Sequence, residues 1–485
     1  MSAHLKQDEP VTSNRLDGMK QGIVGQPLSR VDGLAKVTGT APYAAEYKID
    51  NVAEGVLVTA PITRGEVASI DKDSVLSMPG VLAVVDDERL TTRAAQGTAN
   101  EAPQQDPATV CYWGQPIAIV VAETFEQARD AAKHLKVEYR VHEGAPLDPH
   151  KVKPEEQEDE TVNQGDLDAA MARAAHTVDV EIATEGHASA AMEPHAAIAE
   201  WRDDKLTVHA SLQMPNYNIA ELADSLGIEE SDIRLVSRYV GGGFGSKLGI
   251  SEETVAAAIA ARELGRPVRV VMSRQQVFQC IMRRSETTQK LRLASDQEGK
   301  LDGFAHHALV SNLPGEEFAE PVLQSSHFLY GGENRQLKLE VARIHRMTAG
   351  SVRAPGEAVG MPALEVAMDM LAEKSGVDPV ELRLRNIPDR NPEEGLPFSS
   401  HKLADCLRQG AEKFGWDGGP RKPRQQREGE WWIGTGMASA ARVHNVGEAK
   451  ARVTLKSDGT AVVQSDMTDI GTGTYTIVAQ IAGEM

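Results

Sequence analysis

Residues 233–265 read IRLVSRYV-GGGFGSK-LGI-SEETVAAAIAAREL-G. In this stretch a strand pattern is followed by a glycine loop and then by a helix pattern. The alternation in Ile233–Val240 predicts a β-strand. Ser251 is suited to the N-cap of a helix, the two glutamates after it favour the first turn, and Gly265 is suited to the helix end. This order predicts a loop held between two regular elements.

The loop itself, Gly241-Gly-Gly-Phe-Gly-Ser-Lys247, is the strongest local signal in the chain. Consecutive glycines allow positive φ angles and let backbone N–H groups converge on an oxyanion or phosphate. The loop is not a P-loop, because Ser246 and Leu248 stand where that motif requires Gly and Ser or Thr, and it lacks the third glycine of a dinucleotide fingerprint. A tight turn before a helix and an anion site both remain open.

The regions on either side of this unit predict further mixed α/β structure. On the N-terminal side, strand-like runs occur at 55–60, 81–85, 116–122 and 136–141, and Thr124 is suited to cap a helix that runs through His134. On the C-terminal side, residues 267–272 predict a strand, residues 357–374 a helix ended by Gly376, and Asp378 the start of another. The stretch 25–39 has too many turn residues for a helix.

Breaks in composition divide the chain into regions. Residues 1–24 are polar and are predicted to be mobile, and 146–165, rich in Pro and acidic residues, is predicted to be an exposed connection. These breaks predict a first α/β domain at 25–150, a second region at 166–416 and a third at 431–485, whose last residues resemble the first turns of a helix.

Composition excludes several classes of function. The 485 residues include 51 Lys and Arg against 71 Asp and Glu, a net charge of −20 that argues against nucleic-acid or anionic-membrane partners. No apolar run approaches the ~20 residues of a membrane span, and residues 1–17 lack the apolar region of a secretory signal. The three cysteines, Cys111, Cys280 and Cys406, cannot supply the four ligands of an iron–sulfur cluster, so any redox electrons must leave through another subunit.

Three further motifs are weak when each is taken alone. Arg353-Ala-Pro-Gly356 before a helix suits an anion or a carbonyl, or is a turn with a solvated arginine. The small, hydroxyl-rich Asp469–Thr476 could donate hydrogen bonds to phosphates. His187–His195 holds two histidines and a glutamate, but the spacing fits no helical metal pair, so we interpret these histidines as structural. Arg442 either faces a site or is a surface arginine.

Taken in order, these motifs resemble the molybdenum-binding large subunit of the xanthine dehydrogenase / aldehyde oxidase family, and most closely the bacterial three-subunit aldehyde oxidoreductases. The resemblance runs from Gly25 to Met485 and implies an α+β (mixed α/β) fold. A hammerhead-type α/β domain at 25–150 would be followed by a first molybdenum-cofactor-binding domain at 166–416 and by the start of a second, incomplete one at 431–485. The stretches that carry it are GQPLSRVDGLAKVTGTAPYAAEY, MEPHAAIAEW, ASLQMPN, GGGFGSK, RAPGEAVG and DIGTGTYT.

The resemblance implies a cofactor and its binding residues. The cofactor is a molybdenum–molybdopterin, in the cytosine dinucleotide form, whose metal is held through the pterin dithiolene and by no side chain. Gln213 would hydrogen-bond an oxygen ligand of molybdenum, Arg353 and Pro355 would border the substrate, and Thr472 replaces the family's frequent glutamine. The residues that it assigns to the cofactor are Gln213, Gly242, Gly243, Phe244, Gly245, Arg353, Ala354, Gly471, Thr472, Gly473 and Thr476.

The resemblance also implies an activity and partners. The subunit would oxidise aldehydes to carboxylic acids, or N-heterocycles, with water as the oxygen source, and electrons would pass to partner subunits carrying [2Fe-2S] and FAD. The family's general base, a glutamate, lies beyond Met485, which leaves three explanations: a separate C-terminal half, a truncated record or an inactive remnant. The alternatives are a non-catalytic homologue that keeps only assembly contacts, and a phosphate- or nucleotide-binding protein that uses Gly241–Lys247. The expected location is the cytoplasm, or the periplasm after co-export with a partner.

Overall fold

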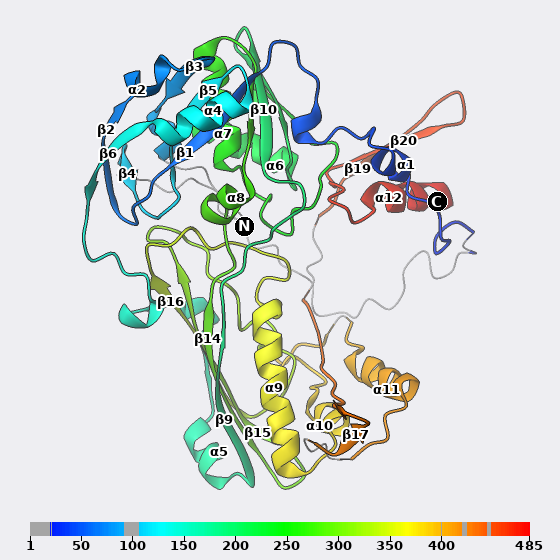
Figure 1. Ribbon diagram of the computed structural model, residues 1–485. Helices are drawn as coiled ribbons and strands as arrows, with labels where there is room; N and C mark the ends of the chain where they lie inside the picture. The colour runs from blue at the N-terminus through cyan, green and yellow to red at the C-terminus, as the bar shows by residue number, and fades with distance from the viewer. Residues whose placement is uncertain (1–19, 21, 92–105, 399, 420–423, 444–447) are drawn as a thin grey trace.

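A computed structural model describes residues 20, 22–91, 106–398, 400–419, 424–443 and 448–485 (Figure 1). The N-terminal stretch predicted to be mobile lies outside the described residues, except for residues 20 and 22–24. Strands and helices are both distributed along the whole described chain, so the predicted α+β (mixed α/β) class is confirmed. No helix among the described residues is long and apolar enough to cross a membrane.

A seven-stranded sheet forms the centre of the upper body in Figure 1, in the order β12-β11-β10-β13-β1-β5-β3. β1 from the first predicted domain pairs in parallel with β13 from the second, with Ala53 opposite Val268. The two regions therefore share one sheet and one apolar core, and the predicted boundary between them stays a prediction. The strands are β1 (Ala53–Thr59), β3 (Val81–Val85), β5 (Pro116–Ala122), β10 (Ala196–Arg202), β11 (Lys205–Ala210), β12 (Ile233–Val236) and β13 (Val268–Val271).

Helix α7 (Glu252–Leu264) follows the glycine loop and packs on β10 and β13. Its residues from Glu252 to Ala261 are all buried, which explains why its sequence is apolar on every side rather than amphipathic. Gly265 ends the helix in the left-handed conformation, as predicted. Ser251 occupies the N-cap position but makes no capping hydrogen bond with its side chain.

The outer part of the first region contains the three-stranded sheet β4-β2-β6, and helix α4 (Phe125–His134) packs nearby on β1 and β5 of the seven-stranded sheet. Thr124 caps α4 by accepting a hydrogen bond from the N–H of Gln127, so this predicted helix and its cap are confirmed. The predicted strand at 136–141 is also confirmed, as β6. The remaining elements are β2 (Gly65–Asp71), β4 (Thr109–Val110), β6 (Lys136–Val141), α2 (Asp73–Leu76) and α3 (Glu88–Thr91).

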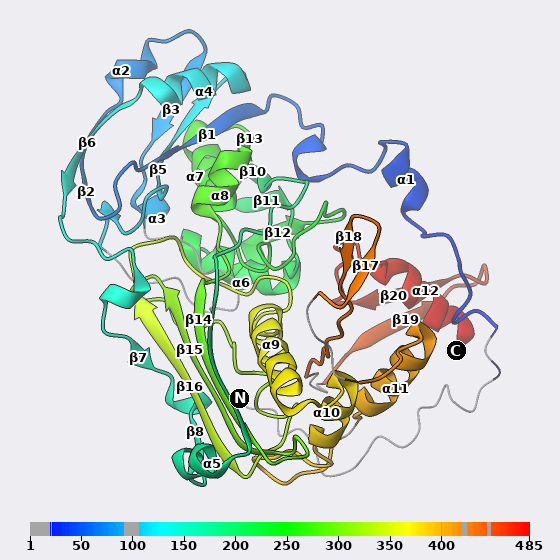
Figure 2. The same ribbon diagram turned by 60° about the horizontal axis from the view of Figure 1, so that its bottom comes forward.

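A long sheet, β7-β16-β15-β14-β9 with β8 also on β16, forms the lower body. Helix α9 (Glu357–Ser375) lies along it, with α10 and α11 on the other side of α9 (Figures 1 and 2). The elements here are β7 (Glu155–Glu156), β8 (Val162–Gln164), β9 (His176–Thr184), β14 (Thr287–Ser295), β15 (Leu301–Asn312), β16 (Asn334–Arg343), α5 (Leu167–Arg173), α10 (Pro379–Asn386) and α11 (Leu403–Phe414).

The two ends of the described chain lie side by side. The carboxylate of Glu484 accepts the N–H groups of Gly22, Ile23 and Val24, at 2.6–3.0 Å. Residues 22–47, named here the N-terminal strap, therefore run from the last helix to the seven-stranded sheet (Figure 2). The other elements are α1 (Gly33–Val37), α6 (Pro215–Leu226), α8 (Arg274–Cys280), α12 (Thr474–Glu484), β17 (Gln426–Glu428), β18 (Trp431–Ile433), β19 (Ala451–Leu455) and β20 (Ala461–Ser465), with 3-10 turns at Ala44–Glu46, Pro149–Lys151, Glu158–Glu160 and Glu230–Asp232.

Three expectations were wrong in detail. The stretch at 146–165 is not only a connection, because β7 and β8 within it pair with β16. The stretch at 25–39 contains the short helix α1. The strand predicted to reach Val240 ends at Val236, because Ser237 turns away and its hydroxyl bonds both the N–H and the carbonyl of Leu212.

His327 lies between two carboxylates that join separate segments of the lower body. Its Nδ1 is 2.9 Å from Glu393 and its Nε2 is 3.2 Å from Glu160. Because a carboxylate only accepts, both ring nitrogens must carry hydrogen, as in the imidazolium. Burial lowers the pKa of His327, but the two carboxylates outweigh it and raise the pKa to about 9.

We expect His327→Gln to change the pH dependence of stability. A raised histidine pKa stabilises the folded chain fully below pH 6.5, and this contribution is lost as the pH rises towards 9. The variant should be less stable than the natural chain by roughly 3 kcal/mol at pH 6 and nearly equal to it at pH 10. Thermal unfolding at both pH values measures this. The same change at exposed His134 serves as the control, and a pH-independent difference would contradict the assignment.

Candidate functional site

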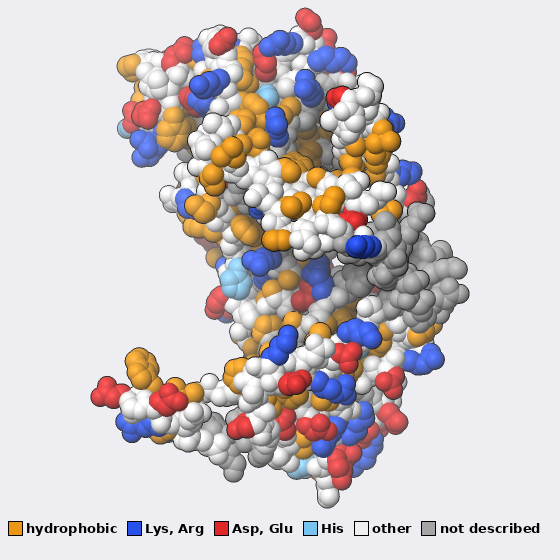
Figure 3. Space-filling model, turned by 90° about the vertical axis from the view of Figure 1, so that its right-hand side faces the viewer, with side chains coloured by type: hydrophobic (Ala, Val, Ile, Leu, Met, Phe, Trp, Pro, Cys, Tyr) orange, Lys and Arg blue, Asp and Glu red, His pale blue; other side chains and the backbone are white. Residues whose placement is uncertain are grey.

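Three loops and the N-terminal strap surround a cleft of about 830 Å³. Figure 3 shows the side of the molecule that lies on the right of Figure 1. Hydrophobic and uncharged side chains cover the middle of this face, between more highly charged regions above and below. The residues that line the cleft are Arg30, Lys36, Tyr43, Met192, Gln213, Val240–Gly245, Leu248, Ser351–Arg353, Pro355, Arg442 and Ile470–Thr472.

The glycine loop packs directly against the loop at 351–356. Gly245 has φ +103°, and a Cβ there would lie 1.9 Å from the carbonyl oxygen of Ser351. The N–H of Arg353 donates to the carbonyl of Phe244 at 2.8 Å. Phe244 itself has φ +56°, a left-handed conformation that is uncommon for a residue with a side chain, and it is 42 % exposed. The contact between the two loops therefore requires glycine at 245.

The glycine loop presents unpaired hydrogen-bond donors. Within the described chain, the N–H groups of Gly242, Gly243 and Phe244 have no hydrogen-bond partner. Gln213 lies beside them, and its side-chain oxygen accepts the N–H of Gly245 at 2.9 Å. Because this bond fixes the oxygen, the amide nitrogen of Gln213 is the atom left to donate. Four neutral donors are thus available at one wall of the cleft.

The loop at 351–356 is held from below by a buried ion pair. Arg284 lies 2.6 Å from Glu320 and donates to the carbonyl of Val352 at 2.8 Å, while Glu320 also accepts the N–H of Gly356 at 2.7 Å. Ala354 adopts φ +53° within this loop. The guanidinium of Arg353 is exposed, and no group in the described part of the chain pairs with it.

The third loop, at 469–473, is organised by Asp469. Its buried carboxylate accepts the N–H groups of Gly471, Gly473 and Tyr475, at 2.9–3.3 Å. Burial raises the pKa of Asp469, but these three donors outweigh burial and lower the pKa overall. Arg30 of the strap lies 3.3 Å from Asp469 and donates to the carbonyl of Gly471 at 3.0 Å, so the strap fixes this loop.

The charges that line the cleft are all positive, although the chain is acidic overall. Arg30, Lys36, Arg353 and Arg442 line it, and none of the described residues in the lining is acidic. Three of these cations pair with carboxylates outside the lining: Arg442, for example, lies 2.7 Å from Glu357. Only Arg353 is unpaired among them, so it is the cation best placed to meet a ligand.

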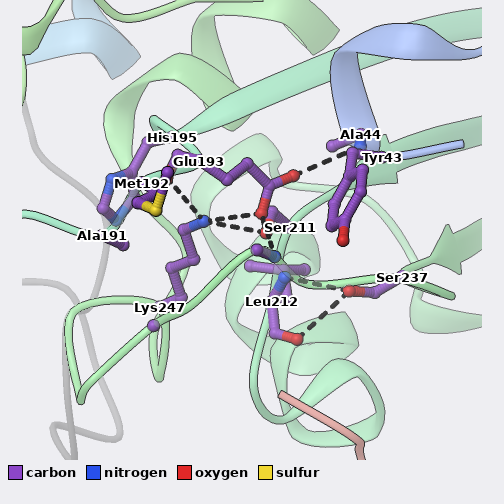
Figure 4. Close-up of polar contacts among 12 residues, drawn as sticks. Tyr43, Ala44, Ala191, Met192, Glu193, His195, Ser211, Leu212, Ser237 and Lys247 are labelled. Carbon is purple, nitrogen blue, oxygen red and sulfur yellow. Dashed lines mark hydrogen bonds and ion pairs between the residues drawn. The ribbon is translucent and has the colours of Figure 1, made fainter. Parts of the chain in front are cut away.

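A buried polar cluster lies behind the glycine loop (Figure 4). Lys247 is fully buried and lies 2.9 Å from the carboxylate of Glu193, and burial lowers the pKa of Lys247. His195 is buried beside it, with Nε2 2.9 Å from the carbonyl of Ser246. Burial lowers the pKa of His195 to about 3, so the ring is neutral and Nε2 donates.

The sequence-predicted residues divide into two groups. Gln213, Gly242, Gly243, Phe244, Gly245, Arg353, Gly471 and Thr472 line the cleft. Three others do not line it. Ala354 and Gly473 lie within their loops with positive φ angles, and the Thr476 hydroxyl accepts the N–H of Val31 at 3.1 Å. His187 is exposed whereas His195 is buried, and no group of three or more His, Cys, Asp and Glu that could hold a metal ion occurs among the described residues.

Sequence reasoning missed the contribution of the N-terminal strap. Arg30, Lys36 and Tyr43 line the cleft, although more than 400 residues separate Arg30 from its partner Asp469. The only sequence signal was the presence of two cations within the motif that begins at Gly25. Glu193 was also missed as a scaffold residue, because its motif was considered only for metal spacing and for its resemblance to the family.

Glu221 connects helix α6 to the segment that follows the glycine loop. Its carboxylate accepts the side-chain N–H of Asn218 at 2.6 Å and the N–H of Ile250 at 3.0 Å. The other oxygen of Glu221 is buried with no hydrogen-bond partner among the described residues. Burial raises the pKa of Glu221 to about 7.

We expect Gly245→Ala to destabilise the chain far more than Gly265→Ala. Both glycines have positive φ, but a Cβ at Gly265 meets nothing within 4 Å. Gly265→Ala should therefore cost only the left-handed strain of about 1–2 kcal/mol, whereas Gly245→Ala adds a backbone clash and should cost roughly 3 kcal/mol or more. Denaturant unfolding measures both, and equal costs would contradict the close packing of the two loops.

Glu221→Gln should make stability less dependent on pH. A glutamate whose folded pKa is raised costs stability as the pH rises from about 4.5 to 7, because the unfolded chain ionises first. The variant should therefore gain about 2–3 kcal/mol over the natural chain between pH 5 and pH 8. Thermal unfolding at the two pH values tests this, with exposed Glu230→Gln as the control. A gain of the same size in the control would contradict the role of burial.

Comparison with known protein families accounts for most of the chain. The model of the aldehyde oxidase and xanthine dehydrogenase a/b hammerhead domain matches residues 38–143. Two models of the molybdopterin cofactor-binding domain match residues 149–387 and 409–485, which together exceed half of the chain. The predicted order, a hammerhead-type domain followed by molybdopterin-binding domains, is therefore confirmed.

Individual relatives agree with these matches. The chain is 41 % identical over 487 residues to the aldehyde oxidoreductase molybdenum-binding subunit PaoC of Escherichia coli K12, covering 99 % of this chain and 66 % of that subunit. The aldehyde oxidoreductase of Desulfovibrio gigas is 26 % identical, with a TM-score of 0.71 over 80 % of this chain and 46 % of that one. Quinoline 2-oxidoreductase of Pseudomonas putida 86, at 19 % identity, shares the fold with a TM-score of 0.80 over 96 % of this chain and 65 % of that one. This chain therefore belongs to the xanthine dehydrogenase / aldehyde oxidase family, and it matches about two thirds of the length of a molybdenum-binding subunit of that family.

Proposed function

We propose that the cleft binds a molybdenum–molybdopterin cofactor in its cytosine dinucleotide form and that the chain acts within a molybdenum hydroxylase. The substrates would be aldehydes, oxidised to carboxylic acids, or N-heterocycles, with water as the oxygen source. One observation carries the proposal: three consecutive N–H groups at Gly242–Phe244 have no partner within the described chain and lie in the cleft beside the free amide of Gln213.

The residues of the cleft fit such a cofactor. Phosphate and metal-bound oxygen atoms accept hydrogen bonds, and the glycine loop offers donors that are neutral and fixed in place. A side chain at 243 would fill this wall, because a Cβ there would lie 2.2 Å from the oxygen of Gln213. The described lining holds cations and no carboxylate, which favours an anionic ligand.

We assign roles to the chain's residues as part of this proposal. The bound cofactor would supply a redox-active metal that accepts two electrons from the substrate. Gln213 and the glycine loop would donate hydrogen bonds to oxygen atoms of the cofactor on one side. The loop Gly471–Gly473 would bind its phosphates on the other. Arg353 would orient a substrate carbonyl, with Pro355 beside it.

Partners are a further part of the proposal. The described cysteines are dispersed, with Cys280 buried and Cys406 exposed, so we assign the [2Fe-2S] and FAD groups to partner subunits. The chain spans 66 % of the length of PaoC, and we assign the family's general base to no residue within it. We place the complex in the cytoplasm, with co-export to the periplasm as the alternative.

Elemental and nucleotide analysis tests the proposal. The complex should be purified without a tag from its native cells, and molybdenum and the CMP released by acid hydrolysis should be measured. About one of each per chain is expected. Intact complex with no molybdenum would contradict the proposal and favour a non-catalytic assembly protein. Molybdenum without CMP would overturn only the cytosine dinucleotide form.

Substitution of Arg353 tests the assignment of the cleft. Arg353→Met should lower kcat/KM for aldehydes, assayed with an artificial electron acceptor, by roughly 10²-fold, because it removes a charged donor at the carbonyl. Arg408→Met, on the exposed surface of α11, is the matched control and should leave kcat/KM unchanged. Equal rates in both variants would exclude Arg353 from the substrate site.

A further inference from the structure

Lys247 uses its ammonium group entirely within the protein. It is fully buried, and its Nζ donates to the carboxylate of Glu193 at 2.9 Å, to the backbone carbonyl of Glu193 at 3.1 Å and to the hydroxyl of Ser211 at 2.9 Å. An ammonium has three N–H donors, so none is left for a ligand. Lys247 therefore cannot bind a phosphate in the way of a P-loop lysine.

Glu193 brings the two ends of the glycine loop to one carboxylate, and Figure 4 shows its contacts with Lys247 and Ser211. The same oxygen that pairs with Lys247 accepts the N–H of Gly241 at 2.6 Å and the hydroxyl of Ser211 at 2.5 Å. The first and last residues of the motif Gly241–Lys247 are thus tied to a single group. The other oxygen lies 3.4 Å from the N–H of Ala44 in the N-terminal strap.

The middle of the loop is held separately. The side-chain oxygen of Gln213 accepts the N–H of Gly245, and the backbone N–H of Gln213 donates to the carbonyl of Lys247 at 2.7 Å. The residues between these restraints, Gly242–Phe244, are those whose N–H groups are unpaired within the described chain. The ion pair fixes the ends of a segment whose centre faces the cleft.

We propose that Glu193 and Lys247 are positioning residues that set the direction of the free N–H donors of the glycine loop. This rests on the proposed function insofar as those donors meet the cofactor. A buried ion pair adds little net stability over an apolar pair of similar volume, so its main effect here is on geometry. The pair touches neither substrate nor cofactor and acts through the loop.

Hydrogen–deuterium exchange of the purified complex tests the pair directly. The double variant Glu193→Leu/Lys247→Met removes both charges and leaves no buried ion unpaired. Amides in peptides spanning 241–248 should exchange about tenfold faster than in the natural protein. Ser211→Ala, which keeps both charges and removes one shared partner, is the milder variant should the double variant fail to fold.

Arg335→Met is the matched control. Arg335 is a fully buried cation of the lower body, 3.3 Å from Glu393, and it does not line the cleft. The Arg335→Met variant should destabilise the chain without altering hydrogen–deuterium exchange at residues 241–248. The positioning variants, in contrast, should lower molybdenum per chain several-fold or lower kcat per molybdenum at unchanged KM.

The outcomes separate this proposal from the proposed function. Natural exchange at 241–248 in a folded positioning variant would overturn the role of the pair, as would unchanged molybdenum content and kcat despite faster exchange. A natural complex without molybdenum would overturn the proposed function, while the exchange rates would still decide whether Glu193 and Lys247 hold the loop.

Discussion

The site depends on a backbone-to-backbone contact between the glycine loop and the loop at 351–356. The approach of Gly245 to the carbonyl of Ser351 leaves no room for a Cβ, and the N–H of Arg353 bonds to the carbonyl of Phe244 across the same junction. Two segments more than a hundred residues apart thus form one rigid wall. Its donors and its cation, Arg353, keep a fixed separation, which is what preorganised binding requires.

Three buried or half-buried ion pairs support the loops around the cleft. Arg284 and Glu320 lie under the loop at 351–356, Lys247 and Glu193 behind the glycine loop, and Arg30 and Asp469 at the third loop. In each pair one partner also binds backbone groups of the loop it supports. Charged groups with several donors or acceptors can fix several backbone atoms at once, which an apolar side chain cannot do.

Local structure was predictable from the sequence, whereas long-range assembly was not. The helix after Thr124, the strand at 136–141 and the end of α7 at Gly265 follow from capping and periodicity. The end of β12 at Val236 did not, because it depends on a hydrogen bond between Ser237 and Leu212 in another segment. The residues that resemble the family's motifs mostly reach the cleft, but the part played by Arg30 depends on contacts with the far end of the chain.

The sheet shared by the two regions has a consequence for the order of folding. β1 forms its parallel ladder with β13, and Ala53 and Val268 are 215 residues apart. At a synthesis rate of about 5–20 residues per second, β13 is synthesised on the order of 10–40 s after β1, so one edge of β1 is unpaired during that time. During that time a row of unpaired N–H and C=O groups is open to pairing with other chains. Because non-local pairing of this kind slows folding, we expect the seven-stranded sheet to be completed late.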